Sequence, residues 1–318
     1  PGSSSDARHF RFWGPGRPFA QKGGVYSRSV SYSCFAVDEK AVVRMVEQQE
    51  LEARYARCAS AKTAVFVYAD HVTDACARSG LMAEGDVLLD MVGGRGLRVA
   101  DVRARASEAR GTAGRLLVDI TVPSHFGCHA FELGADVQLE ALDRVAAGML
   151  RRKVVAISSR IDLTVAGDAL DSDDLAAIAQ GLDSLHERMQ RHFDHARALA
   201  EYLSCCDSLI SGGRVAVSYP GLTSHPDHDL ATRVLVHGFG PAVDFELPDA
   251  WGVAAGEFIR CCRLNGRSQP AGGFNTRLHA RDGSDGRAVR IFAGLDNPLE
   301  IADDLDQAMR WFRNPPAP

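Results

Sequence analysis

Lysine and basic surface are scarce in this sequence. Only four of its 318 residues are lysines, and its 36 basic residues are outnumbered by 41 acidic ones, for a formal net charge of −5. No run of like charge stands out along the chain. Proteins that bind a phosphodiester backbone through charge need a basic field, so no nucleic-acid partner is expected.

Long apolar runs and metal-type cysteine spacings are absent as well. A membrane helix needs about 20 consecutive apolar residues, and no run of that length occurs, so we expect no membrane span. The eight cysteines show no C-x-x-C spacing, and two pairs are adjacent, Cys205–Cys206 and Cys261–Cys262. This pattern predicts reduced, mostly buried thiols in a cytoplasmic protein, and no metal site.

What is present is an alternation of strand-like and helix-like segments. Short strands of buried type are predicted at 63–68, 86–92, 116–122 and 154–158, with amphipathic or helix-like segments at 41–59, 71–83 and 99–109. Such alternation is typical of an α/β domain with a parallel sheet.

The second half predicts a smaller α+β domain behind a long helix. Apolar residues mark one face of a helix over 172–202, and the segments after it are strands at 215–219, 242–247 and 289–293 and a closing helix at 299–311. We therefore expect an N-terminal arm (1–40), an α/β domain (41–171), a linking helix (172–202) and a C-terminal α+β domain (203–318).

Short motifs along the chain carry a family resemblance. They are L-V-D-I-T at 117–121, E-L-G-A-D at 132–136, G-L-D-S-L with R-M-Q-R-H at 181–192, Y-P-G-L-T-S-H-P-D-H at 219–228 and R-I-F-A-G-L-D at 290–296. They resemble the pyridoxal-phosphate (PLP) enzymes of cysteine and methionine metabolism, the transsulfuration family of cystathionine synthases and lyases and methionine γ-lyase.

The resemblance implies a fold-type-I, aminotransferase-like architecture. This is a mostly parallel, seven-stranded sheet sandwiched by helices, with a smaller C-terminal α+β domain. The chain is shorter than ordinary members, and the shortening falls between Asp90 and Val99. A strand and a helix of the cofactor domain are therefore expected to be missing, and the segment at 92–94 offers no aromatic ring to stack on the cofactor.

The lysine that would hold PLP as a Schiff base is not where the resemblance places it. The family's S-A-T-K falls on A-L-D-R at 141–144, so Arg144 takes the lysine's position. A guanidinium stays protonated at accessible pH and cannot act as the amine nucleophile. The chain's lysines are Lys22, Lys40, Lys62 and Lys153. None fits the motif, and Lys153 would need a rebuilt segment to reach the site, so no covalently held PLP is expected.

Other residues of the implied site are retained in part. Asp119 resembles the aspartate that pairs with the pyridine nitrogen, or it is an ordinary carboxylate at a strand end. Arg290 resembles the arginine that binds the substrate α-carboxylate, or it forms a structural salt bridge. Ala69 and Asp70 fall in the phosphate loop, where a carboxylate repels a phosphate dianion.

The arm and two histidine-containing segments offer further candidates. Tyr26 and Arg28 resemble residues that extend across a dimer interface to the neighbour's cofactor phosphate, or they pack locally. His125, Cys128 and His129 are candidates for a nucleophile or a metal-ligand set. They lack an acidic partner at ligand spacing, so a structural role is favoured. The H-P-D-H loop at 225–228 resembles a connecting loop and is assigned no chemistry.

Two functions remain open. The first is a non-catalytic homologue, related to sulfur amino-acid metabolism, that forms a homodimer or a hetero-oligomer with an intact family member, which it supports through Tyr26 and Arg28. The second is a divergent lyase or transferase that acts on an amino acid, with PLP held noncovalently or replaced.

Overall fold

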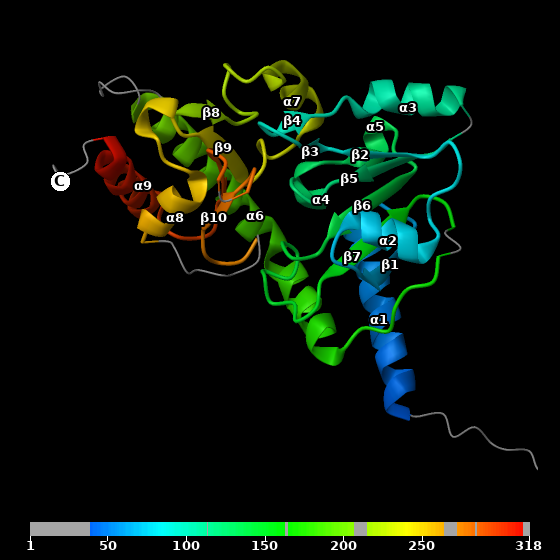
Figure 1. The fold of residues 1–318 in the computed structure, drawn as a ribbon. Helices are drawn as coiled ribbons and strands as arrows, with labels where there is room; N and C mark the ends of the chain where they lie inside the picture. Colours follow the sequence, from blue (N-terminus) through cyan, green and yellow to red (C-terminus); the bar gives the residue numbers. More distant parts are fainter. Residues whose placement is uncertain are drawn as a thin grey trace, which may run out of the picture. The chain divides into compact units, whose positions relative to one another are not determined.

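The computed structural model describes residues 39–112, 114–162, 165–206, 215–263, 272–283 and 285–313 (Figure 1). The predicted arm, with Tyr26 and Arg28, lies outside these residues, except that Glu39 and Lys40 belong to the first helix, α1 (Glu39–Cys58). No described helix combines the length and the apolar character that a membrane crossing requires.

A five-stranded sheet forms the centre of the first half. Its strands are β1 (Thr63–Tyr68), β2 (Val87–Asp90), β5 (Leu116–Asp119), β6 (Val137–Ala141) and β7 (Val154–Ser159). Their order is β1-β7-β6-β5-β2, and only the two pairs that involve β7 are antiparallel. Four strands therefore run one way and β7 runs against them, which confirms a mostly parallel sheet. The resemblance implies seven strands, whereas this sheet has five within the described residues.

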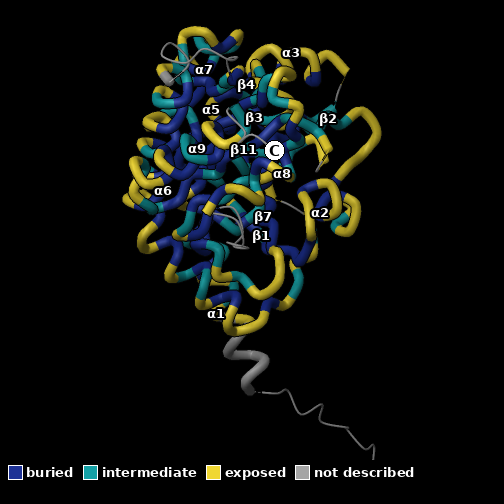
Figure 2. Tube along the Cα trace, turned by 60° about the vertical axis from the view of Figure 1, so that its left-hand side comes forward, coloured by how far each residue is buried: buried dark blue, intermediate teal, exposed yellow. Residues whose placement is uncertain are grey.

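Helices cover both faces of this sheet, as predicted. Consecutive strand residues point to opposite faces, and β1 shows the result. Phe66 packs with Tyr55 of α1 and Phe193 of α6 (Ser172–Cys206), whereas Val67 packs with Ala75 of α2 (Val72–Ser79). Three further helices in this half are α3 (Val102–Gly111), α4 (Ser124–Gly127) and α5 (Ala130–Leu133). Figure 2 shows yellow, exposed residues along α3 and dark blue, buried residues in the interior.

Strand β6 is not predicted by the hydrophobic pattern. The sequence favours a helix-like segment there, because Gln138 and Glu140 interrupt the apolar residues. Both polar side chains are nevertheless fully buried, at 1% and 0% exposure. Glu140 is stabilised there by polar partners from other parts of the chain, which a local pattern does not reveal. The side-chain amide of Gln138, in contrast, is buried without a hydrogen-bond partner among the described residues.

Helix α6 joins the two halves of the described chain. It begins at the predicted residue, Ser172, and continues to Cys206, beyond the predicted end at 202. Asp173 and Asp174 lie in its first turn, where the helix dipole favours negative charge. Asp174 also accepts hydrogen bonds from the Tyr68 hydroxyl (3.0 Å) and the Arg151 amide (2.7 Å).

The second half contains a four-stranded antiparallel sheet, in the order β10-β11-β9-β8. Its strands are β8 (Ala216–Ser218), β9 (Ala242–Glu246), β10 (Arg277–Ala280) and β11 (Ala288–Phe292), and its helices are α7 (His228–Val234), α8 (Ala255–Cys261) and α9 (Pro298–Arg313). Strand β10 is not predicted, since basic side chains occupy every second position. A short hairpin of β3 (Val92–Gly93) and β4 (Arg98–Val99) occupies the shortened region.

Candidate active site

A cavity of about 960 Å³ lies where the carboxyl ends of β1, β2, β5 and β6 face the β10–β11 hairpin. Ligand sites of open α/β sheets form at this edge, because parallel strands bring their carboxyl ends together. The cavity lining includes Asp119, Arg144 and Arg290. The structure thus brings together three of the predicted site residues, which are up to 171 positions apart in the sequence (290 − 119).

Asp119 is the last residue of β5 and lies beside Asp90, the last residue of β2. Its Oδ1 accepts a hydrogen bond from the Thr121 amide at 2.8 Å. Burial, together with the charge of Asp90, raises the pKa of Asp119 to about 6, against the opposing effects of the Thr121 hydrogen bonds and the charge of Arg144. Two adjacent carboxylates favour a cationic group directly beside Asp119.

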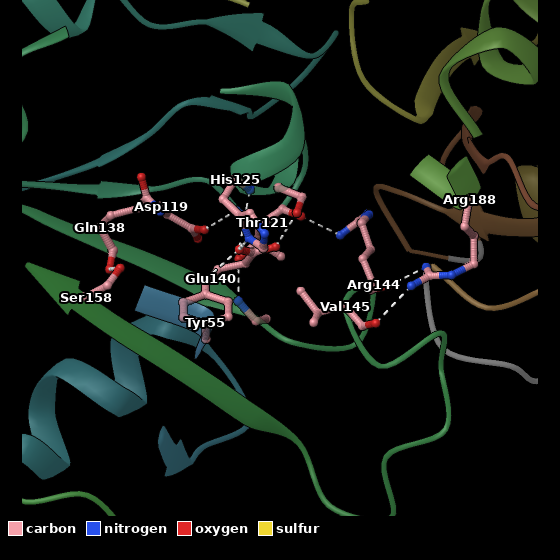
Figure 3. A network of polar contacts seen from close by, with 12 residues as sticks. Tyr55, Asp119, Thr121, His125, Gln138, Glu140, Arg144, Val145, Ser158 and Arg188 are labelled. Atoms are coloured by element: carbon pink, nitrogen blue, oxygen red, sulfur yellow. Dashed lines mark hydrogen bonds and ion pairs between the residues drawn. The ribbon is translucent and has the colours of Figure 1, made fainter. Parts of the chain in front are cut away.

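Arg144 lies in the loop after β6 and is 97% buried (3% exposed). Its Nη1 donates to the Thr121 carbonyl at 2.7 Å, and its guanidinium carbon lies 5.3 Å from the centroid of the Phe292 ring. Burial lowers its pKa to about 10. Arg188 of α6 holds the loop by donating to the carbonyls of Arg144 and Val145 (Figure 3).

Arg290 of β11 is paired with a carboxylate of the chain itself. Its Nε and Nη2 donate to the two oxygens of Asp244 at 2.6 and 2.8 Å, and Nη2 also donates to the Gly94 carbonyl at 2.9 Å. Asp244 further accepts from the Gly96 amide at 3.1 Å. Both side chains of the pair are largely buried, at 12% and 7% exposure. The geometry is the bidentate one that Arg290 would use for a ligand carboxylate.

Lys153 lines the same cavity, in contrast to the sequence-based expectation that it would need a rebuilt segment. The expectation was wrong because β7 runs antiparallel to β6. The amino end of β7, next to Lys153, therefore lies at the same sheet edge as the carboxyl ends of β1 and β6. Its Nζ lies 3.5 Å from the carbonyl oxygen and 4.0 Å from the carboxylate of Asp70.

A buried polar network behind this edge is centred on Glu140, which no sequence motif singles out (Figure 3). Glu140 accepts hydrogen bonds from the Tyr55 hydroxyl at 2.6 Å and from Ser124, and its Oε2 lies 2.7 Å from His125 Nδ1. Burial acts to raise the pKa of Glu140, but His125 and the hydrogen bonds outweigh it, so the pKa is lowered. The available signal was a charged residue between the apolar residues Leu139 and Leu142.

The other sequence candidates do not meet at the cavity. His125 is committed to Glu140. Cys128 is buried, which raises its pKa to about 12, and His129 lies 3.6 Å from Glu132. The described residues contain no group of three potential metal ligands. The histidines at 225 and 228 lie 2.8 and 2.9 Å from the carbonyl oxygens of Gly96 and Pro220, as expected for a connecting loop.

The cysteines depart from the prediction in one respect. The six cysteines whose exposure the structure describes are free thiols, and half of them are buried, fewer than the expectation of mostly buried thiols. The buried ones are Cys76, Cys128 and Cys262, and the exposed ones are Cys58, Cys205 and Cys261.

A mostly parallel sheet with one reversed strand, covered by helices and facing a smaller antiparallel sheet across a cavity, is the fold of the fold-type-I PLP-dependent enzymes. The family of Cys/Met metabolism PLP-dependent enzymes matches residues 86–310, and the chain belongs to this family.

Two relatives of the chain are cystathionine enzymes by their names. Cystathionine gamma-synthase from Mycobacterium tuberculosis is 29% identical over 234 residues, which are 67% of this chain and 58% of the relative. Cystathionine beta-lyase from Lactococcus lactis is 28% identical over 48% of this chain and 41% of the relative. The chain therefore spans less than two thirds of the length of these relatives.

Solved structures share the fold. A methionine gamma lyase from Micromonospora echinospora superposes with a TM-score of 0.68 and 21% sequence identity, covering 83% of this chain and 86% of that one.

Proposed function

We propose that this chain is a non-catalytic member of the family, which supports another subunit in sulfur amino-acid metabolism. The observation that carries the proposal is the environment of Arg144. By the motif, Arg144 takes the position of the lysine. Its guanidinium is almost fully buried and donates to the Thr121 carbonyl. An arginine cannot serve as the amine that binds PLP.

The residues around the cavity do not fit a covalently held PLP, the cofactor that the family implies. Asp119 suits the pyridine nitrogen, because its buried carboxylate favours a cationic neighbour. Arg144 cannot form a Schiff base with the aldehyde carbon of PLP. The carboxylate of Asp70, just before α2, repels the phosphate dianion of PLP. We therefore assign no reaction step to the cofactor.

The test is the optical spectrum after incubation with PLP. We expect the wild-type chain to show no visible absorbance from lysine-bound PLP and no adduct after borohydride reduction, and Arg144→Lys to acquire both. Arg160→Lys is the matched control, since Arg160 also donates to a backbone carbonyl, that of Phe131, and lies 5.3 Å from that residue's ring centroid. A reducible chromophore in the wild-type chain would contradict the proposal.

The supporting role is assigned to Tyr26 and Arg28 on the resemblance alone. An arginine–phosphate contact is charge-assisted and contributes about 1.5–3 kcal/mol, enough to change a partner's PLP affinity by tenfold or more. Mixing the chain with an intact cystathionine gamma-synthase should therefore increase PLP retention by that enzyme, and Arg28→Ala should remove the increase. Absence of a complex, or an effect that survives the substitution, would exclude this role.

One observation favours the alternative, a divergent lyase or transferase. Lys153 lines the same cavity as Asp119, so an amine is present at the site edge. On this alternative, the isolated chain turns over cystathionine and Lys153→Ala abolishes the turnover. Lys62→Ala is the control, because Lys62 is exposed and paired with Asp162 outside the cavity. Failure of the wild-type chain to act on cystathionine, homocysteine or methionine would favour the non-catalytic proposal.

A further inference from the structure

One face of the β10–β11 hairpin presents a row of basic side chains to the cavity. Arg277 and His279 alternate along β10, and Arg281 follows at the same spacing; all three line the cavity. Residues two apart in a strand share a face. Arg277 lies opposite Phe292 of β11, and His279 lies opposite Arg290, so all five side chains face the same way.

Most of the cavity's cations already have a carboxylate partner within the chain. Arg290 is held by Asp244, Arg151 lies 2.7 Å from Asp173, and Lys153 lies 4.0 Å from Asp70. Arg281 lies 3.9 Å from Asp282. Arg290 and Arg151 are therefore held in close ion pairs, whereas the pairs of Lys153 and Arg281 are longer.

Arg277 differs from the cations with partners. Its side chain is half-buried and lines the cavity, and its guanidinium makes no hydrogen bond or ion pair within the part of the chain that the structure describes. Asp143 interacts with its charge through space, as it does with Arg144 and Lys153, but no ion pair joins Asp143 to Arg277 among the described residues. A guanidinium in this setting retains its full fork of donors.

Arg144 approaches Phe292, the cross-strand neighbour of Arg277, from the opposite wall of the cavity. Its guanidinium contacts the ring of Phe292. The Nε of Arg144 is buried without a hydrogen-bond partner. Two arginines from different walls of the cavity thus lie beside one aromatic ring.

We propose that this hairpin face is an anion subsite, in which Arg277, with Arg144 beside it, binds the oxyanion group of a small molecule. The group is a carboxylate or a phosphate, since both match the planar fork of a guanidinium. Asp244 keeps Arg290 out of this role by occupying its fork. The subsite does not depend on whether the chain binds PLP.

The experiment is isothermal titration of the purified chain with inorganic phosphate and, separately, with succinate. We expect the wild-type chain to bind at least one probe, and Arg277→Gln to weaken that binding by tenfold or more, with unchanged thermal stability because Arg277 has no partner to lose. A preference for phosphate or for succinate then identifies the class of oxyanion.

The matched control is Arg95→Gln. Arg95 is exposed, is paired with Glu246, and does not line the cavity, so it removes the same charge without touching the subsite. A second variant, Asp244→Asn, should tighten binding by releasing Arg290. The proposal is overturned if neither probe binds the wild-type chain, if Arg277→Gln binds as tightly as wild type, or if Arg95→Gln weakens binding equally.

Discussion

Asp119 is ionised at neutral pH in a setting that disfavours its charge. The pKa of its carboxyl is raised from 3.8 to about 6, first by burial and also by Asp90. A carboxyl with a raised pKa in the folded state binds its proton more tightly there than in the unfolded chain. Its contribution to folding is therefore most favourable at low pH and is lost as the pH rises to about 6.

We predict that Asp119→Asn stabilises the protein at pH 7 and not at pH 3.5. A shift of about two pKa units corresponds to roughly 3 kcal/mol, and asparagine retains the oxygen that accepts from Thr121. Urea unfolding at the two pH values measures the difference, with the exposed Asp74→Asn as control. A loss of stability at pH 7 would show that the carboxylate has a cationic partner.

At the scale of single elements, helix α6 positions the loop that contains Arg144. Gly181 lets the helix approach this loop, since a Cβ there would lie 1.9 Å from the Val145 carbonyl oxygen. Seven residues later on the same helix, Arg188 donates to the carbonyls of Arg144 and Val145. One helix therefore supplies both the close contact and the hydrogen bonds that hold the loop.

We predict that Gly181→Ala destabilises the fold by about 1–3 kcal/mol, the usual cost of overpacking. Helix propensity alone predicts the opposite, a gain of about 1 kcal/mol, so the sign of the change separates the two effects. Denaturant unfolding measures it, and Gln180→Ala, at the exposed neighbouring position, should be close to neutral. A stabilising Gly181→Ala would mean that the loop moves away without cost.

At the scale of the whole described chain, α6 contributes to two hydrophobic cores. Leu185 packs with α1 and the first sheet, and Leu199 packs with the antiparallel sheet of the second half. Because one continuous helix belongs to both cores, loss of either core exposes apolar surface of the other. The two halves are therefore expected to unfold together.

We predict that Leu185→Ala and Leu199→Ala each lower the stability of a single unfolding transition by about 2–5 kcal/mol. Far-ultraviolet circular dichroism and tryptophan fluorescence should report the same midpoint in each variant. Glu187→Ala, at an exposed position of the same helix, should leave that midpoint nearly unchanged. Separate transitions for the two substitutions would show that the halves unfold independently.

The sequence by itself determined the α/β class, the family and most elements. Strands such as 63–68 and the helix from Ser172 were predictable because their signals are local: runs of β-branched residues, or an apolar stripe with a period of 3.6. The residues Asp119, Arg144 and Arg290 were identified as site residues from motifs, and the structure places all three on one cavity.

Only the tertiary structure decided which charges meet. The partners of Glu140, the Asp244 carboxylate on Arg290, the position of Lys153 and the basic face of β10 all depend on contacts between distant segments. Asp244 and Arg290 are 46 residues apart and become neighbours through the register of β9 and β11. A local pattern shows which side chains are polar, but strand direction and register determine which of them share a face and a cavity.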